Sequence, residues 1–242
     1  KVSPKYTFLN LKLAIYNHFT IANRNADTEP NSRTFRYPIE YGSPRRVTQN
    51  FTATGAAAAI VTKDPTNIKI ESCTIGKVTD YGIKDANNMG AIMAPSAART
   101  IIEHLNDTKR SANYYDLILT GDLGTLGSEL MMTLLLEIRK QPCWKFPFDL
   151  KDGTQHDIYF VFLEMSFKHI DAGAELIVDK KLTDQGASGP VCLPLYFIEK
   201  VLKEKKYKRI LIVGTGALQN QTLVNQKNTL PSVSHAVSIE VI

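Results

Sequence analysis

One stretch of the chain, residues 114–140, reads as a strand, a glycine-rich loop and a helix in direct succession. Its letters are YYDLILTGDLGTLGSELMMTLLLEIRK. The apolar run Leu117–Leu119 predicts a buried strand, the letters TGDLGTLG predict the loop, and a helix is expected to start near Ser128. Such a unit places its loop at the carboxyl edge of a sheet, which predicts an α/β fold.

Other segments continue this alternation of strands and helices. A small-residue strand over 50–62 is predicted to pair as a hairpin with a strand over 67–76, and Pro95 is expected near the first turn of a helix. A further helix is expected from about 190 to 205. Additional strands are predicted over 156–165, 174–181, 209–213 and 235–242. The whole pattern is typical of the α/β class.

Composition excludes several kinds of protein. With 242 residues and 43% hydrophobic residues, the chain can bury a full core. Its three cysteines, Cys73, Cys143 and Cys192, form no CxxC pair, which argues against a zinc site or a disulfide framework and is compatible with a reducing compartment. No apolar run approaches the roughly 20 residues of a membrane span.

The ends and the charge of the chain add little. Lys12 interrupts the apolar start and no small-residue cleavage site follows, so no signal peptide is expected. The first residue is not Met, and we therefore expect a fragment of a longer protein. The net charge is +5, and part of it lies over 200–209, where cations suit a solvated helix end. No basic stripe with interleaved aromatic residues occurs, so no nucleic-acid partner is expected.

The turn Gly186–Gly189, with the letters GASG, runs into an amphipathic helix. Unpaired N–H groups at a helix start can hold a carboxylate, a phosphate or an oxyanion. Ser188 could instead cap the helix while the two glycines allow close packing, and the turn taken alone favours this second interpretation.

Neither glycine-rich loop is a nucleotide site. The letters VGTGALQN over 213–220 lack the third glycine of a dinucleotide fingerprint, and TGDLGTLG lacks the Lys-Ser/Thr of a P-loop. The histidines are candidate acid–base groups, although a structural role is favoured for each, and His104 is expected at the surface. Cys192 starts a helix, yet its apolar neighbours favour a buried structural thiol.

Several longer blocks occur in a characteristic order. They read FRYPIEYG, TATGAAAAIVT, GKVTDYGIKDANNMGAIMAPSA, YYDLILTGDLG, GASG, ILIVGTGAL and HAVSIE. Over residues 33–140 and 184–242 the chain resembles the stage V sporulation protein AD family, a branch of the thiolase-like superfamily. The resemblance implies two similar α/β halves in alternating layers, with the end of the first half in 1–90 and the whole second half in 91–242.

The resemblance also implies how the chemistry of the superfamily has changed. Thiolases carry His-Pro-x-Gly-x-Ser-Gly, with the His as base, and Cys-x-Gly-x-Gly, with the Cys as acid–base group. Here Thr183 stands in place of that His and Ile212 in place of that Cys, and neither side chain titrates near neutrality. The first thirty residues contain no cysteine that could act as nucleophile. We therefore expect no enzyme activity.

Other departures lie between the two motifs. Residues 144–183 are longer than the family pattern, and the family's His-Asp survives as His156 and Asp157 but is followed by Ile158 and Tyr159 instead of Cys-Gly. No cofactor and no resident metal are expected. The candidate ligand-binding residues are His156, Asp157, Gly186, Ser188, Gly189, Gly214, Gly216 and His235.

The function that the resemblance implies is binding of dipicolinic acid, with calcium, for its uptake into the developing spore. Arg and Lys residues of the RTFR and SPRR loops would complete the charge. The implied partners are membrane-bound sporulation transport proteins, the implied location is the cytoplasm beside the spore inner membrane, and the implied oligomer is a homodimer. Two alternatives stay open: an acyl-transfer enzyme that uses His156, His235 or an upstream cysteine, and a scaffolding subunit of a membrane transport complex.

Overall fold

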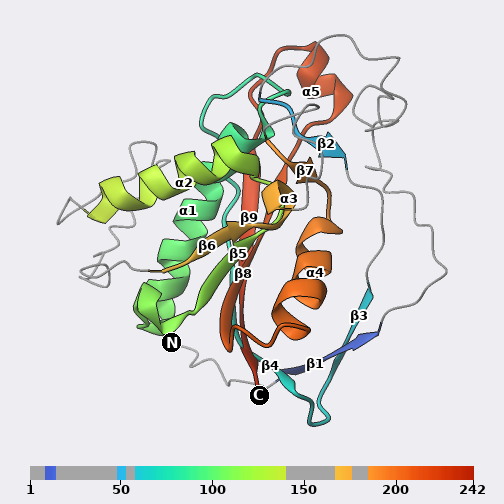
Figure 1. Cartoon of the computed structure of the whole chain (residues 1–242). Helices are drawn as coiled ribbons and strands as arrows, with labels where there is room; N and C mark the ends of the chain where they lie inside the picture. The colour runs from blue at the N-terminus through green and yellow to red at the C-terminus, as the bar shows by residue number, and fades with distance from the viewer. Residues whose placement is uncertain (1–8, 15–47, 53–57, 140–166, 176–184) are drawn as a thin grey trace.

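A mixed sheet of seven strands forms the centre of the protein, in the order β3-β1-β4-β9-β8-β5-β6 (Figure 1). The computed structural model describes residues 9–14, 48–52, 58–139, 167–175 and 185–242. The strands are β1 (Leu9–Ala14), β3 (Ala58–Thr62), β4 (Ile68–Ile75), β5 (Leu117–Thr120), β6 (His169–Asp171), β8 (Arg209–Ala217) and β9 (Ser232–Val241). Strand β5 is parallel to β6 and β8, whereas β9 is antiparallel to β8 and β4.

Helices cover both faces of this sheet. On one face lie α1 (Met89–Thr108) and α2 (Gly124–Arg139), and on the other lie α3 (Ala172–Glu175), α4 (Cys192–Tyr196) and the π-helix η4 (Phe197–Leu202). The remaining elements are β2 (Phe51–Thr52), β7 (Ala187–Ser188), the short 3₁₀ helix η3 (Ala112–Tyr114) and α5 (Gln221–Asn225). The predicted α/β class is confirmed.

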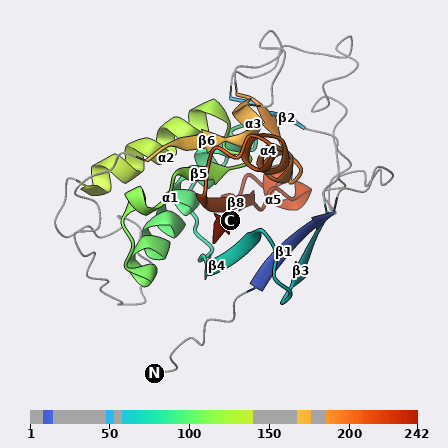
Figure 2. The ribbon, with the colours of Figure 1, turned by 60° about the horizontal axis from the view of Figure 1, so that its bottom comes forward.

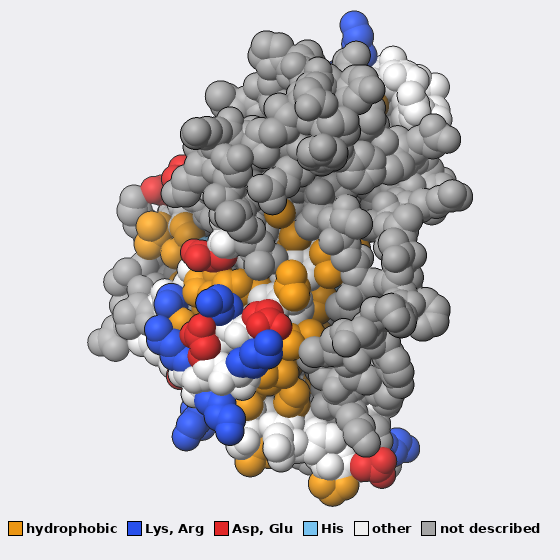
Figure 3. Space-filling model, turned by 45° about the vertical axis from the view of Figure 1, so that its right-hand side comes forward, with side chains coloured by type: hydrophobic (Ala, Val, Ile, Leu, Met, Phe, Trp, Pro, Cys, Tyr) orange, Lys and Arg blue, Asp and Glu red, His pale blue; other side chains and the backbone are white. Residues whose placement is uncertain are grey.

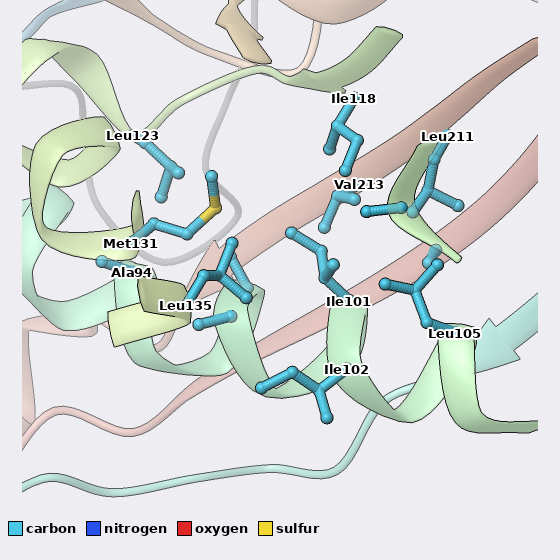
Figure 4. Close-up of a cluster of buried hydrophobic side chains, with 14 of the residues drawn as sticks. Ala94, Ile101, Ile102, Leu105, Ile118, Leu123, Met131, Leu135, Leu211 and Val213 are labelled. Carbon is cyan, nitrogen blue, oxygen red and sulfur yellow. The ribbon is translucent and has the colours of Figure 1, made fainter. Parts of the chain in front are cut away.

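The short strand β5 is buried by helices on both faces of the sheet. All four of its residues are buried. Ile118 belongs to the core beneath α1 and α2, whereas Leu117 and Leu119 belong to the core beneath α4 and η4. Figure 4 shows the first core, to which Ile101 of α1, Leu135 of α2 and Leu211 of β8 contribute side chains. An unbroken apolar run is the expected sequence of a strand that is buried on both faces.

Helix α1 begins six residues before Pro95, earlier than the sequence predicts. The side chain of Asn88 accepts a hydrogen bond from the backbone N–H of Ala91 at 3.2 Å and so caps its start. At the other end, Lys109 takes a left-handed conformation and Arg110 N–H donates to the carbonyl of Leu105 at 3.0 Å. Both ends are therefore fixed by local hydrogen bonds.

Small polar residues let α1 approach β9 closely. The hydroxyls of Ser96 and Ser234 lie 2.8 Å apart, Ser232 Oγ donates to the carbonyl of Ile92 at 2.8 Å, and Thr100 Oγ1 donates to the carbonyl of Ser234 at 3.0 Å. Each of these buried hydroxyls has a partner, so this contact avoids the cost of unsatisfied polar groups.

His104 is buried, and its predicted place at the surface is wrong. Its Nδ1 lies 2.8 Å from Thr74 Oγ1 and its Nε2 lies 2.7 Å from the Tyr115 hydroxyl. Tyr115 in turn accepts from Arg110, which pairs with Glu71 at 3.0 Å. Burial, aided by the charge of Arg110, lowers the pKa of His104 to about 4. A helical sequence pattern predicts that a polar residue such as His104 is exposed, because the pattern does not reveal hydrogen-bond partners that are remote in the sequence.

The hairpin that the sequence predicts between 50–62 and 67–76 does not form. Strand β1 pairs with both β3 and β4 and therefore lies between them (Figure 2). The strand expected over 174–181 is also wrong at its first two residues, which belong to α3. Its remainder and the strand expected over 156–165 lie outside the described residues.

The charged run near residue 200 is a solvated helix surface, as predicted. Lys203 pairs with Glu199 at 2.6 Å and Lys200 pairs with Glu204 at 3.2 Å, each one helical turn apart. In Figure 3 basic and acidic side chains are mixed on this face, and hydrophobic side chains form a strip beside them. None of the helices within the described ranges is both long enough and apolar enough to cross a membrane.

Replacing Gly127 by Ala should destabilise the protein. A Cβ at residue 127 would lie 2.6 Å from the Cα of Gly90, where α2 crosses α1. Helix propensity alone favours Ala by about 1 kcal/mol. Overpacking against backbone costs about 1–3 kcal/mol and should outweigh this gain.

Urea unfolding measures how Gly127→Ala changes the free energy of unfolding. Gly214→Ala is the matched control, because a Cβ there meets no atom within 4 Å. We expect the control to change the free energy of unfolding by less than about 0.5 kcal/mol. A Gly127→Ala protein more stable than the wild type would contradict the close crossing.

Candidate functional site

The carboxyl ends of β5 and β8 meet the turn that precedes α4. Strands β5 and β8 pair in parallel up to Thr120 and Val213. A Cβ built on Gly121, just after β5, would lie 3.1 Å from the Cβ of Leu193 at the start of α4. The glycine-rich segments that the sequence singles out therefore gather at one edge of the sheet.

The carboxylate of Asp171, at the end of β6, is the buried centre of this edge. Its Oδ1 accepts from Thr120 Oγ1 at 2.7 Å and from Leu123 N–H at 3.0 Å. Its Oδ2 accepts from Gly124 N–H at 3.0 Å and from Ala174 N–H at 3.1 Å. Burial raises the pKa of Asp171, while these four donors favour its charged form. Because Asp171 caps α2, this helix starts at Gly124, four residues before the predicted start.

Asp122 holds the turn before α4. Its Oδ1 accepts from the backbone N–H of Gly189 at 2.6 Å, and its carbonyl accepts from Asn50 Nδ2 at 3.1 Å. Burial raises the pKa of Asp122 to about 6, and the nearby charge of Asp171 adds to the increase. The sequence suggests that backbone N–H groups of this turn could bind an external anion. The N–H of Gly189 is instead hydrogen-bonded to a carboxylate of the protein itself.

Gln185 accepts hydrogen bonds from further backbone N–H groups at the start of α2. Its carbonyl accepts from Thr125 N–H at 2.9 Å and its Oε1 accepts from Leu126 N–H at 2.9 Å. With Asp171 on the preceding N–H groups, the first turn of α2 is saturated by acceptors from the protein itself.

Close packing explains the first glycine of the turn. Gly186 has φ +108°, and a Cβ there would lie 2.4 Å from the Cα of Ala174. The next two residues form β7, which pairs in parallel with β2, and Ser188 is buried there. Ser188 does not cap α4, because the residue at the cap position is Val191. The packing interpretation of Gly186 is confirmed.

Cys192 is fully buried, as predicted, and is unsuited to nucleophilic chemistry. Burial raises the pKa of its thiol to about 12, and the charges of Asp122 and Asp171 add to the shift. The thiolate, which is the reactive form, is therefore scarce at neutral pH. In the described part of the chain, no three His, Cys, Asp or Glu side chains gather as metal ligands.

The second glycine pair is open rather than packed. Gly214 lies directly opposite His235 in the β8–β9 pair, and a Cβ on Gly214 would meet no atom of the described residues within 4 Å. A Cβ on Gly216 would meet only the carbonyl of Val233, at 3.9 Å. His235 is exposed, and its Nδ1 accepts from Gly76 N–H at 3.2 Å. The strand β8 continues through both glycines to Ala217, beyond its predicted end.

The six described candidates thus form two groups at this edge. Gly186, Ser188 and Gly189 belong to a packed turn, whereas Gly214, Gly216 and His235 belong to an open strand pair. His156 and Asp157 lie outside the described residues, as does Thr183.

Sequence reasoning missed the residues that organise the edge: Asn50, Asp122, Asp171 and Gln185. Asp122 carried a signal, since it lies in the loop TGDLG directly after a buried strand. Asp171 carried none, because its donors come from segments as far as 51 residues away.

The central sheet with helices on both faces and the glycine-lined carboxyl edge are those of an α/β protein. The chain matches the family described as stage V sporulation protein AD over residues 14–146 and 160–240. It is also 38% identical over 222 residues to Stage V sporulation protein AD of Bacillus subtilis (strain 168). The match covers 90% of this chain, which spans 58% of that relative's length. The chain belongs to the stage V sporulation protein AD family, and its role is in sporulation.

Replacing Asp122 by Asn should change how stability depends on pH. The pKa of Asp122 is raised from 3.8 to about 6. Between these values the unfolded chain has lost a proton that the folded chain still holds. The contribution of Asp122 to stability therefore falls as pH rises from about 4 to 6 and then levels off.

Urea unfolding of both proteins at pH 4, 5, 6 and 7 measures this difference. The pKa of His169 is lowered to about 4 by burial and gives the opposite slope, but it does so in both proteins and cancels. The stability of the wild type minus that of Asp122→Asn should decline across the window. A difference that is constant or rises with pH would show that Asp122 does not titrate there.

Proposed function

We propose that the protein is a non-catalytic binding protein for dipicolinic acid, which it delivers for uptake into the developing spore. It acts in the cytoplasm at the spore inner membrane, together with membrane-bound sporulation transport proteins. Calcium accompanies the ligand as cargo. This proposal rests on family membership and on the chemistry of the carboxyl edge.

The observation that carries the non-catalytic part is the environment of Ile212. This residue stands where thiolases place their acid–base cysteine, in β8 opposite Val237, and both side chains pack against the core beneath α4. Neither of these two side chains can transfer a proton. Cys192, at the start of α4, is buried, and burial raises the pKa of its thiol to about 12. Loss of one general acid or base costs about 10²–10⁴ in rate, so the glycine scaffold is better suited to binding than to condensation.

One observation favours a scaffolding role beside binding. On the α4 side of the sheet, Ile75 is 83% exposed, and nearby Val78 is 66% exposed. Exposed apolar side chains that adjoin one another can form a surface that contacts other proteins. Co-purification with membrane-bound transport proteins tests this role, and a homodimer is the oligomer that we expect.

Titration of the intact protein with dipicolinate tests the proposal. We expect heat of binding in calorimetry and a higher unfolding temperature with the ligand. At a free ligand concentration 100 times Kd, the stabilisation should be about 2.7 kcal/mol. Titrations with and without calcium separate the free dianion from its chelate.

A thioester hydrolysis and condensation assay is the companion measurement. We expect no turnover above the uncatalysed rate. Turnover that His156→Ala or His235→Ala abolishes would overturn the non-catalytic proposal, and absence of both heat and thermal shift would overturn dipicolinate binding.

A further inference from the structure

The run of charged residues over 200–209 divides into two parts with different surroundings. In the first part, Lys200 and Lys203 pair with glutamates one helical turn away. The second part follows η4 and contains the exposed cations Lys205, Lys206, Lys208 and Arg209. None of these four side chains has a carboxylate within ion-pair distance among the described residues.

The second part lies at the amino end of the parallel strands, opposite the candidate site. Asp116, directly before β5, donates its backbone N–H to the carbonyl of Arg209 at 2.8 Å. Lys168, directly before β6, accepts from the N–H of Ile118 in β5 at 2.8 Å. Because β5, β6 and β8 are parallel, exposed Lys168 reaches the same end of the sheet as Arg209. Figure 1 shows this end at the bottom of the view, at the end of β9 marked C, and α5 at the top.

Two tyrosines hold several of these cations in place. Lys168 Nζ donates to the Tyr207 hydroxyl at 2.7 Å, and Lys206 Nζ lies 5.7 Å from the centre of the same ring. The guanidinium of Arg209 lies 4.6 Å from the centre of the Tyr114 ring. An aromatic face attracts a cation, so these contacts fix where the charges lie. We call this surface the amino-end patch, which consists of Lys168, Lys205, Lys206, Lys208 and Arg209.

The acidic side chains beside the amino-end patch have partners of their own. Asp116 Oδ2 accepts from the backbone N–H groups of Lys208 and Arg209, each at 2.9 Å. Glu204 pairs with Lys200 at 3.2 Å. The positive charge of the patch is therefore only partly balanced by the described residues.

This arrangement fits an anionic bilayer better than a nucleic acid. Single-stranded nucleic acids bind through bases that stack on exposed aromatic rings. Tyr207 is only 7% exposed, and the ring of Tyr114 already contacts Arg110, Arg209 and Tyr115. A membrane surface requires no stacking, because its negative potential attracts lysine and arginine side chains that lie near it.

We propose that the amino-end patch binds a membrane surface rich in anionic phospholipids. This surface extends the proposed function and rests on one part of it, the location at a membrane. It names the face of the protein that meets the bilayer and the lipid chemistry that this face recognises. The carboxyl edge, at the other end of the strands, then points away from the lipid. Attraction by a few cations is reversible, so it acts together with membrane-bound partners.

Co-sedimentation of the intact protein with lipid vesicles tests this proposal. We expect binding to vesicles of equimolar phosphatidylglycerol and phosphatidylcholine, and none to vesicles of phosphatidylcholine alone. Added salt should weaken the binding, because ions screen exposed charges. Each lysine near an anionic bilayer contributes about 1 kcal/mol, equivalent to about fivefold in affinity. The triple variant Lys205→Gln, Lys206→Gln and Lys208→Gln should therefore bind about 100-fold more weakly.

A second triple variant, Lys77→Gln, Lys84→Gln and Lys227→Gln, is the matched control. It removes the same number of exposed cations from loops at the carboxyl end, where Gly76 contacts His235 and Leu230 N–H donates to the carbonyl of Ile83. The two variants have the same net charge and differ in the place of the change. We expect the control to bind within about twofold of the wild type, since distant charges are screened. Both variants are first checked for an unchanged circular dichroism spectrum and unfolding temperature.

The outcomes separate this inference from the proposed function. Equal loss of binding in both triple variants would show a response to net charge alone and would overturn the role of the amino-end patch. Absence of wild-type binding to the anionic vesicles, or tighter binding to duplex DNA than to these vesicles at the same salt concentration, would also overturn it. Dipicolinate titration and co-purification with transport proteins test the proposed function separately, because neither variant changes a candidate ligand-binding residue.

Discussion

The buried carboxylate of Asp171 joins the segments that meet at the carboxyl edge of the sheet. It accepts from Thr120 at the end of β5, from Leu123 and Gly124 at the start of α2, and from Ala174 in α3. Asp122 then holds the turn before α4 through its hydrogen bond with the backbone N–H of Gly189. A buried charge is tolerated because four donors surround it, and removing them would leave it unpaired. The start of α2 and the turn before α4 are positioned by this arrangement, whereas Gly214 and His235 are positioned by the pairing of β8 with β9.

The edge therefore divides into two chemically different parts. The packed turn contains two carboxylates whose pKa values are raised by burial, together with the Cys192 thiol, whose pKa is about 12. It keeps the glycines of a thiolase motif, yet its backbone donors satisfy the protein's own acceptors. The second part, around Gly214 and His235, has no carboxylate in its paired row, and no atom of the described residues lies within 4 Å of a Cβ built on Gly214.

The sequence predicts the parts of this structure that depend on neighbouring residues. The apolar run of β5, the ion pairs near Lys200 and the burial of Cys192 all follow from local patterns. For the candidate site, the sequence singles out the glycines and His235, and it does not reveal the carboxylates that organise the edge. The roles of Asp171 and His104, and the position of β1 between β3 and β4, depend on partners far away along the chain. No periodicity or propensity reports such long-range hydrogen bonds and strand pairings.

The central claim is that Asp171 and Asp122 occupy the backbone donors at the start of α2 and in the packed turn before α4. A crystal structure of the intact protein with dipicolinate, the proposed ligand, tests this most directly. The account predicts that the Asp122–Gly189 hydrogen bond and the hydrogen bonds to Asp171 stay intact. A ligand bound to Gly189 N–H or to the start of α2, with Asp122 or Asp171 displaced, would contradict it.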